Sequence, residues 1–154
     1  MRFIFSCTVM FGVVLAALAD SNSPPATDEL TGLPLYPATH NIADPGHPLK
    51  LPEVTICKCK MQTDFYNVYE AKMDATLAWC TANLAEFKHV HAYANGCSQD
   101  AFYNAEGTIL VSVMGSHGKD GENTAAESIS YKKFTPGLAE KTILGMKDRK
   151  IVCP

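Results

Sequence analysis

The sequence predicts an α+β domain in which one long helix packs on an antiparallel sheet of about four to five short strands, with disulfides adding stability. Residues 65–87 show the one sustained helical periodicity in the chain. The segments after this stretch are short, rich in β-favouring residues and separated by turn residues. Cysteines at Cys57 and Cys153 mark the two ends of the region.

The first nineteen residues have the pattern of a secretory signal peptide. Arg2 is followed by an uncharged apolar run and by Ala17-Leu18-Ala19, a small-x-small cleavage site. The apolar run is too short for a membrane span. We therefore expect residues 1–19, with Cys7, to be removed, and the mature chain to be secreted without stable membrane association.

Residues 20–52 contain seven of the nine prolines and few large apolar side chains. Such a composition favours extended, solvated chain. We interpret this segment as a linker or pro-segment and place a single compact domain at residues 53–154. The sequence leaves open whether the segment is removed.

The formal net charge argues against general binding to polyanions. Loss of Arg2 with the signal peptide changes that charge from −3 to about −4. A mildly acidic chain has no overall electrostatic attraction for nucleic acid or for an anionic membrane. Only a local basic cluster would supply one.

The first strand is expected at residues 53–60, where β-branched and polar residues alternate. Thr63 or Asp64 is a suitable N-cap for the helix that follows. Apolar residues then recur at intervals of three and four, which predicts one buried helical stripe. The stripe consists of Phe65, Tyr69, Met73, Leu77, Cys80, Leu84 and Phe87.

Five further strands are expected after the helix, because each segment is short, β-favouring and bounded by turn residues. The last two are separated by residues 145–148, a suitable hairpin connection. The predicted strands are residues 89–93, 108–114, 128–134, 140–144 and 149–153.

The mature chain has an odd number of cysteines, so at least one thiol stays unpaired within the chain. On a single strand, Cys57 and Cys59 would face the same way. We expect one of them to bond to Cys153 and so to link the two ends of the domain. A second bond is expected between Cys80 and either Cys97 or the remaining member of the pair.

The candidate catalytic residues are His89 and His91, which a strand would place on the same face. Such a pair is able to act in general acid–base catalysis or to ligate a metal, with His117 as a third ligand. The alternative interpretation is two histidines on the outer face of a sheet. We predict no bound metal and no cofactor.

The candidate binding residues lie in a glycine-rich loop and near the C-terminus. The loop, residues 115–123, matches neither a phosphate-binding nor a calcium-binding signature. Long polar loops on a rigid scaffold are nevertheless common recognition sites. The alternative interpretation of the lysines is that they lie at a strand edge and keep that edge solvated. The candidates are His117, Lys119, Asp120, Lys132, Lys147 and Arg149.

The order of these features resembles the small secreted effectors of plant-pathogenic fungi, and among them the ribonuclease-like group. The resemblance covers residues 53–154 in outline. It implies the fold of guanyl-specific fungal ribonucleases, whose enzymes use a histidine and a glutamate on adjacent strands, an arginine and a second histidine on a late strand. His89 or His91 corresponds to the first histidine, whereas residues 140–153 contain no histidine and Arg149 is the one arginine of the mature chain.

Half of that catalytic apparatus is therefore missing, and we expect a secreted, non-enzymatic effector of the virulence type. It would bind a host protein, with RNA as an alternative target, either in the apoplast or after translocation into host cells. A secreted hydrolase such as a ribonuclease, using His89 and His91, is the second hypothesis. A killer-toxin-like or inhibitory protein is the third. The sequence leaves the source organism, the molecular target and the oligomeric state open.

Overall fold

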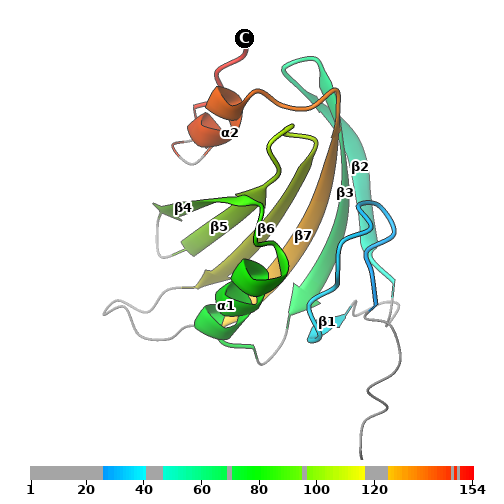
Figure 1. Cartoon of the computed structure of the whole chain (residues 1–154), viewed down its shortest axis with the longest axis vertical. Helices are drawn as coiled ribbons and strands as arrows, with labels where there is room; N and C mark the ends of the chain where they lie inside the picture. Colours follow the sequence, from blue (N-terminus) through cyan, green and yellow to red (C-terminus); the bar gives the residue numbers. More distant parts are fainter. Residues whose placement is uncertain are drawn as a thin grey trace, which may run out of the picture.

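The structure is a computed structural model that describes residues 26–40, 47–68, 71–94, 97–116, 125–146, 148 and 150–154. These residues form a seven-stranded antiparallel sheet with two helices (Figure 1). The strand order is β1-β3-β7-β6-β5-β4, and β2 also pairs with β3. The strands are β1 (Thr39–His40), β2 (Leu49–Ile56), β3 (Cys59–Val68), β4 (Lys88–Ala94), β5 (Cys97–Tyr103), β6 (Ile109–Ser116) and β7 (Ala126–Thr135).

The predicted single long helix is wrong. Helix α1 spans only Met73–Asn83, and the residues before it form β3, which pairs with both β2 and β7. The side chains of Asp64, Tyr66 and Val68 are all buried, which is the period-two pattern of a strand with one covered face. The predicted helical stripe therefore combined residues of a strand, β3, with residues of a helix, α1.

The first predicted strand, residues 53–60, is also divided in two. β2 ends at Ile56 and β3 begins at Cys59, with Cys57 and Lys58 forming the turn between them. Both turn residues have positive φ, 51° and 67°, as a two-residue hairpin turn of the primed type requires. Neither is glycine, asparagine or aspartate, so the usual sequence signal for this turn is absent.

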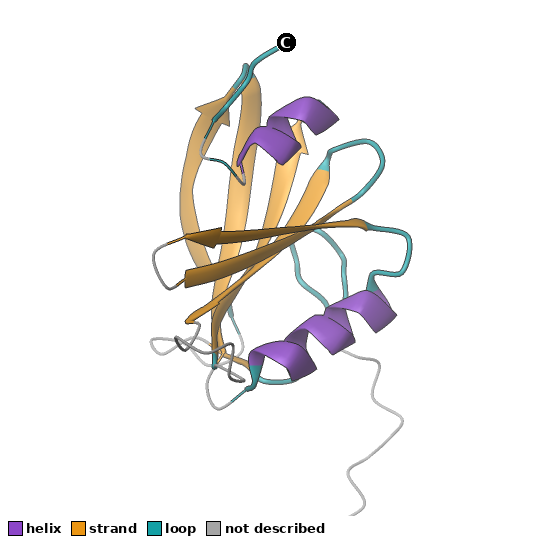
Figure 2. Cartoon of the chain, turned by 90° about the vertical axis from the view of Figure 1, so that its left-hand side faces the viewer, coloured by secondary structure: helices purple, strands orange, loops and turns teal. Residues whose placement is uncertain are grey.

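The two helices cover opposite faces of the sheet, as Figure 2 shows. Met73 and Cys80 of α1 cluster with Val111 and Ile129, whereas Ile143 of α2 (Glu140–Met146) clusters with Leu110. Because Leu110 and Val111 are consecutive in β6, their side chains project from opposite faces. We call these the α1 face and the α2 face.

The two last predicted strands are wrong. Residues 140–144 lie in α2 rather than in a strand, and residues 150–154 have no regular secondary structure. The prediction therefore missed β5 and placed a hairpin at the C-terminus, where the structure has α2 followed by irregular chain.

One disulfide joins the two ends of the domain as expected: Cys57 in the β2–β3 turn is bonded to Cys153, 96 residues later. The second predicted bond is wrong, because Cys59, Cys80 and Cys97 are free thiols. Cys80 is buried on the α1 face and Cys59 clusters with the residues of the α2 face, so the sheet separates them.

The segment before the sheet contributes buried contacts of its own. The hydroxyl of Tyr131 donates a hydrogen bond to the backbone oxygen of Pro34, and Asp28 is fully buried. The hydroxyl of Tyr66 donates to Asp28 Oδ2 at 3.1 Å. Among the described residues, neither helix is long and apolar enough to cross a membrane.

Candidate functional site

His89 and His91 lie on β4, a strand at the edge of the sheet, and both project from the α1 face. The cross-strand register establishes the face, because His91 stands opposite Asp100 of β5, and Asp100 stands opposite Val113 of β6. Directly opposed residues share a face. The sequence prediction that the two imidazoles face the same way is therefore consistent with their position on β4.

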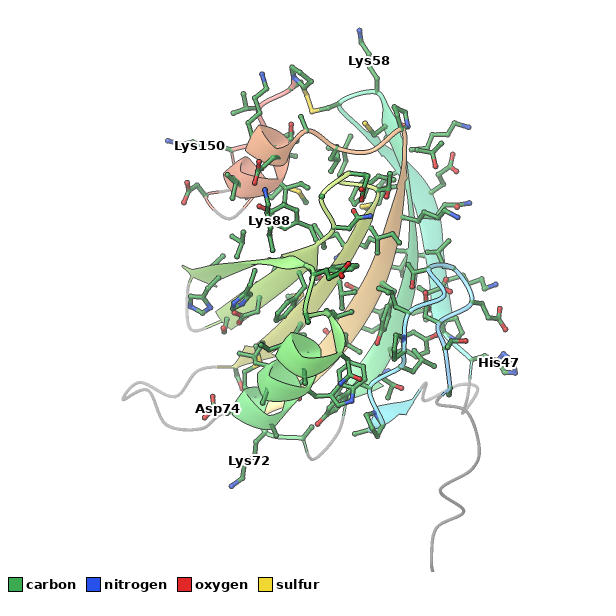
Figure 3. All side chains as sticks on the ribbon, in the orientation of Figure 1. His47, Lys58, Lys72, Asp74, Lys88 and Lys150 are labelled. Atoms are coloured by element: carbon green, nitrogen blue, oxygen red, sulfur yellow. A yellow bond between two sulfur atoms is a disulfide. The ribbon has the colours of Figure 1, made fainter. Side chains whose placement is uncertain are left out.

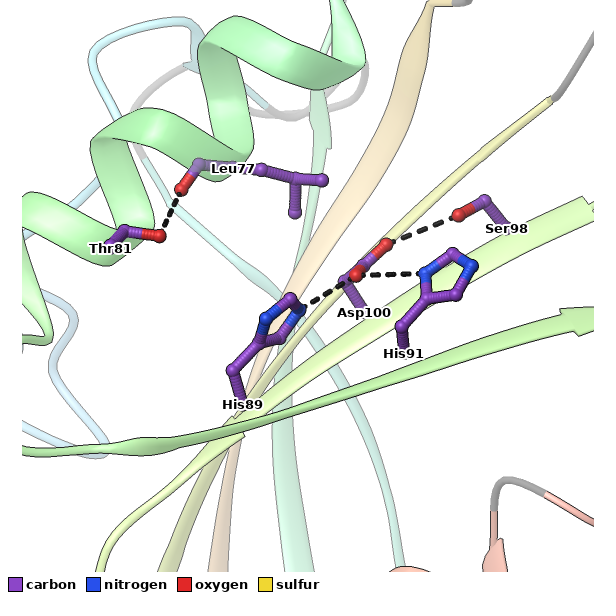
Figure 4. Close-up of polar contacts among 6 residues, drawn as sticks. All are labelled: Leu77, Thr81, His89, His91, Ser98 and Asp100. Carbon is purple, nitrogen blue, oxygen red and sulfur yellow. Dashed lines mark hydrogen bonds and ion pairs between the residues drawn. The ribbon is translucent and has the colours of Figure 1, made fainter. Parts of the chain in front are cut away.

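Both imidazoles contact the same carboxylate oxygen (Figure 4). His89 Nε2 lies 2.7 Å and His91 Nδ1 lies 3.0 Å from Asp100 Oδ1. The other oxygen, Oδ2, accepts a hydrogen bond of 3.1 Å from the hydroxyl of Ser98. We call these four residues the His–Asp cluster.

The carboxylate of the cluster is buried, while its imidazoles reach solvent. The side chain of Asp100 is 1% exposed, and those of His89 and His91 are 44% and 51% exposed. A buried carboxylate needs hydrogen-bond donors in place of water, and the two rings and one hydroxyl provide them. The two histidines and Ser98 thus also have a structural role, because they supply the hydrogen bonds that the buried carboxylate of Asp100 needs.

The ring of His89 is fixed on a second side. It stacks on the buried Phe102 with the ring centroids 4.5 Å apart and the planes 7° from parallel. The stacking and the contact with Asp100 together hold the imidazole in one orientation. An oriented, half-exposed imidazole is suited to exchanging protons with a ligand or to hydrogen-bonding one.

The described residues include no group of three or more histidine, cysteine, aspartate or glutamate side chains arranged to hold a metal ion. Within the cluster, the nitrogens nearest to Asp100 are already engaged by its oxygen. His117, the suggested third ligand, lies outside the described residues.

The candidate binding residues are only partly described. Lys132 lies on β7 and projects from the α2 face, away from the His–Asp cluster, because it stands opposite Leu110. The structure therefore does not bring Lys132 together with His89 or His91. The other five candidates lie outside the described residues: His117, Lys119, Asp120, Lys147 and Arg149.

Lys132 lines a cavity of about 40 Å³ between α2 and the sheet. A wider cavity of about 370 Å³ lies by β2 and β3, where Lys50, Glu53 and Asp64 contribute to its lining. Burial, followed by the charge of Asp28, raises the pKa of the Asp64 carboxyl. The sequence prediction identified neither cavity.

Asp100 is the functional residue that sequence reasoning missed. Residues 97–103 were not predicted as a strand, although Ser98, Asp100 and Phe102 are buried in alternation. A period-two pattern with two polar residues at its inward positions has a weak hydrophobic signal. The available hint was the pair of histidines two positions apart on the neighbouring strand, because both can donate hydrogen bonds to one buried carboxylate.

Comparison with known protein families, characterised proteins and solved structures found no match.

Proposed function

We propose that the chain is a secreted, non-enzymatic protein of the effector type that binds a host protein at the β4 edge of its sheet. The observation that carries this proposal is the contact of both candidate catalytic imidazoles with one oxygen of Asp100. Cleavage of RNA through the 2′-hydroxyl needs a base and an acid on opposite sides of the reacting phosphorus. Two rings held by the same oxygen lie together on one side.

The edge strand β4 has the properties of a binding template. Its seven residues, Lys88–Ala94, include no proline or glycine, and its register with β5 has no irregularity. At the other side of the sheet, β2 carries Pro52 and a register shift between Leu51 and Val54, features that discourage pairing with another chain. Among the described residues, no strand pairs with the outer edge of β4.

An extended protein segment is the partner that such an edge accepts. Added strands gain affinity from backbone hydrogen bonds and specificity from side chains on alternate positions. On one face of β4 these positions are His89 and His91, whose imidazoles are partly exposed beside the edge where an added strand would lie.

A protein partner fits the charge distribution better than RNA does. The chain has a formal net charge of −3. Near β4, Lys88 Nζ is engaged by Glu140 Oε1 at 2.7 Å. Figure 3 shows Lys58, Lys72 and Lys88 in separate parts of the molecule rather than in one patch. RNA binding depends on several phosphate contacts by clustered lysines or arginines.

Position-specific photo-cross-linking tests the proposed edge. A benzoylphenylalanine in place of His91 would report on β4, and the same group in place of the exposed Val54 would report on β2 in an otherwise identical protein. Because the resemblance is to effectors of plant-pathogenic fungi, the partner is sought in plant tissue extract. We expect one discrete cross-linked species from position 91 that is absent from position 54 and from unfolded protein. Identical products from the two positions, or none from position 91, would refute the proposal.

The second candidate function is a secreted hydrolase, and Asp100 is the observation that favours it. A carboxylate that hydrogen-bonds an imidazole holds the ring in one orientation, as a general base requires. In that case Asp100 would replace the glutamate that the family resemblance implies on a strand adjacent to the histidine. Loss of activity in the His91→Ala variant would distinguish this function from binding.

A further inference from the structure

Lys132 has an unusual environment for a lysine. Its Nζ donates hydrogen bonds to Ser112 Oγ at 2.6 Å and to Ser130 Oγ at 2.8 Å. The two hydroxyl groups are 2.8 Å apart and hydrogen-bond each other. Both serines are buried, so the amine ends in a small polar cluster inside the α2 face of the sheet.

The space beside this cluster is otherwise almost entirely apolar. It is a cavity of about 40 Å³, large enough for more than one water molecule or for a short aliphatic group. Gln99 is its other polar residue. Its apolar lining comes from Val90, Ala92, Ala101, Leu110, Ile143 and Met146.

Among the residues that the structure describes, no carboxylate lines the cavity to balance the charge of Lys132. Helix α2 carries Glu140 and Lys141 over this face, and Glu140 is engaged by Lys88 Nζ and by the hydroxyl of Tyr103. Burial lowers the pKa of the Lys132 ammonium to about 8. About a tenth of the amine is thus neutral at pH 7, far more than for an ordinary lysine, and a neutral amine in an apolar pocket is a nucleophile for carbonyl compounds.

We propose that the Lys132 cavity is a covalent capture site for a short aliphatic aldehyde. The lone pair of neutral Nζ attacks the carbonyl carbon while the C=O π electrons move to oxygen. One proton then moves from nitrogen to that oxygen, and Ser112 and Ser130 are placed to relay it. The carbinolamine loses water, which leaves a C=N bond between Nζ and the former carbonyl carbon.

Because the walls of the cavity are apolar, we expect it to accept an aldehyde with a short alkyl chain. The aldehyde carbon must meet Nζ at the serine cluster, and its chain then lies against Leu110 and Ile143. The site lies on the opposite face from the His–Asp cluster, although Val90 and Ala92 of β4 form part of its lining.

Reductive trapping with propanal tests this proposal. The folded chain is treated with propanal and cyanoborohydride, whose hydride converts the imine to a secondary amine, and labelled lysines are identified by peptide mapping. Lys133 is the matched control, because it is the next residue of β7 and is exposed. At pH 7 we expect Lys132 to be labelled about tenfold faster than Lys133.

Two variants separate capture in the cavity from general lysine reactivity. Lys132→Arg should remove the fast label and leave that of Lys133 unchanged. Ile143→Trp, which fills the cavity, should slow labelling of Lys132 but not of Lys133, with circular dichroism confirming that the variant is folded. Equal labelling rates for the two lysines, or labelling of Lys133 alone, would overturn the proposal.

Discussion

Asp100 Oδ1 lies 2.7 Å from His89 Nε2, so a carboxylate that is almost completely buried is held by an imidazole that is almost half exposed. This contact connects the interior of the sheet to its edge. A change in the position of the His89 ring therefore alters the hydrogen bonding of a buried carboxyl group. The relationship has consequences for stability as well as for function.

A double-mutant cycle on His89 and Asp100 measures this contact. We expect His89→Ala and Asp100→Asn to be non-additive, with a coupling of about 1–3 kcal/mol at pH 6, because either change alone leaves a partner of a charge-assisted hydrogen bond unsatisfied. Urea unfolding of the four proteins gives the value. His47→Ala, a change at an exposed histidine away from the cluster, should alter stability by less than about 0.5 kcal/mol. A coupling energy below about 0.5 kcal/mol would show that the contact does not stabilise the folded protein.

The environment of the Asp64 carboxyl leads to the prediction that its ionisation makes the folded protein less stable as the pH rises. Burial and the nearby Asp28 raise the pKa of the Asp64 carboxyl above its ordinary value of 3.8. Its ionisation therefore opposes folding, and the stability present below pH 3.8 is lost as the pH rises through the folded-state pKa. In addition, Asp64 Oδ2 has no hydrogen-bond partner among the described residues.

We accordingly expect Asp64→Asn to be more stable than the wild type at pH 7.5 and equally stable near pH 3.5. Urea unfolding at the two pH values measures the difference. The exposed Asp148→Asn is the control and should show no such divergence. A variant that is less stable than the wild type at pH 7.5 would mean that the ionised carboxylate has a stabilising partner.

The burial of Lys132 leads to the reverse prediction, that stability increases as the pH rises. Burial lowers the pKa of its ammonium from 10.5 to about 8, so protonation opposes folding below about pH 8. Stability is regained as the pH rises from about 8 towards 10.5, where only the unfolded chain remains protonated. Lys132→Met should therefore be more stable than the wild type at pH 7, and this advantage should shrink by pH 9.5. Thermal unfolding at both pH values checks it, and Lys133→Met should show neither effect.

The disulfide between Cys57 and Cys153 closes almost the whole described domain, with a sequence separation of 96 residues. Removing a bond that closes so long a loop costs about 2–5 kcal/mol, chiefly because the unfolded chain becomes less constrained. We expect Cys153→Ser to lower the free energy of unfolding by that amount. Cys97→Ser removes an exposed free thiol and should have little effect. Non-reducing peptide mapping that found Cys153 unbonded would contradict the assignment.

Particular residues show why the fold was only partly predictable. Cysteines near both ends of the predicted domain correctly indicated a covalent link, because that inference needs no secondary structure. The predicted strands at residues 89–93, 108–114 and 128–134 overlap almost completely with β4, β6 and β7, where β-branched and aromatic residues are frequent. The helix was overextended because Phe65 and Tyr69 happen to continue the spacing of Met73 and Leu77.

The pairing of strands lay beyond the reach of local patterns. β3 is set beside β7 by contacts such as Tyr66 with Ile129, more than sixty positions apart in the chain. The same is true of the site. The pair His89 and His91 is visible in the sequence, but Asp100 becomes their partner only through the register between β4 and β5. Lys132 was grouped with other C-terminal lysines, although alternation along β7 turns it inward to Ser112 and Ser130.

The most direct test of the claim that the two histidines are not catalytic is an RNA cleavage assay. Protein that begins at residue 20, the start that the sequence predicts for the secreted chain, is incubated with a fluorogenic RNA from pH 5 to pH 8, beside its His91→Ala variant. We predict that both proteins leave the RNA intact, since the two imidazoles share one oxygen of Asp100. Cleavage by the wild type that is lost in the His91→Ala variant would contradict the account and establish the hydrolase.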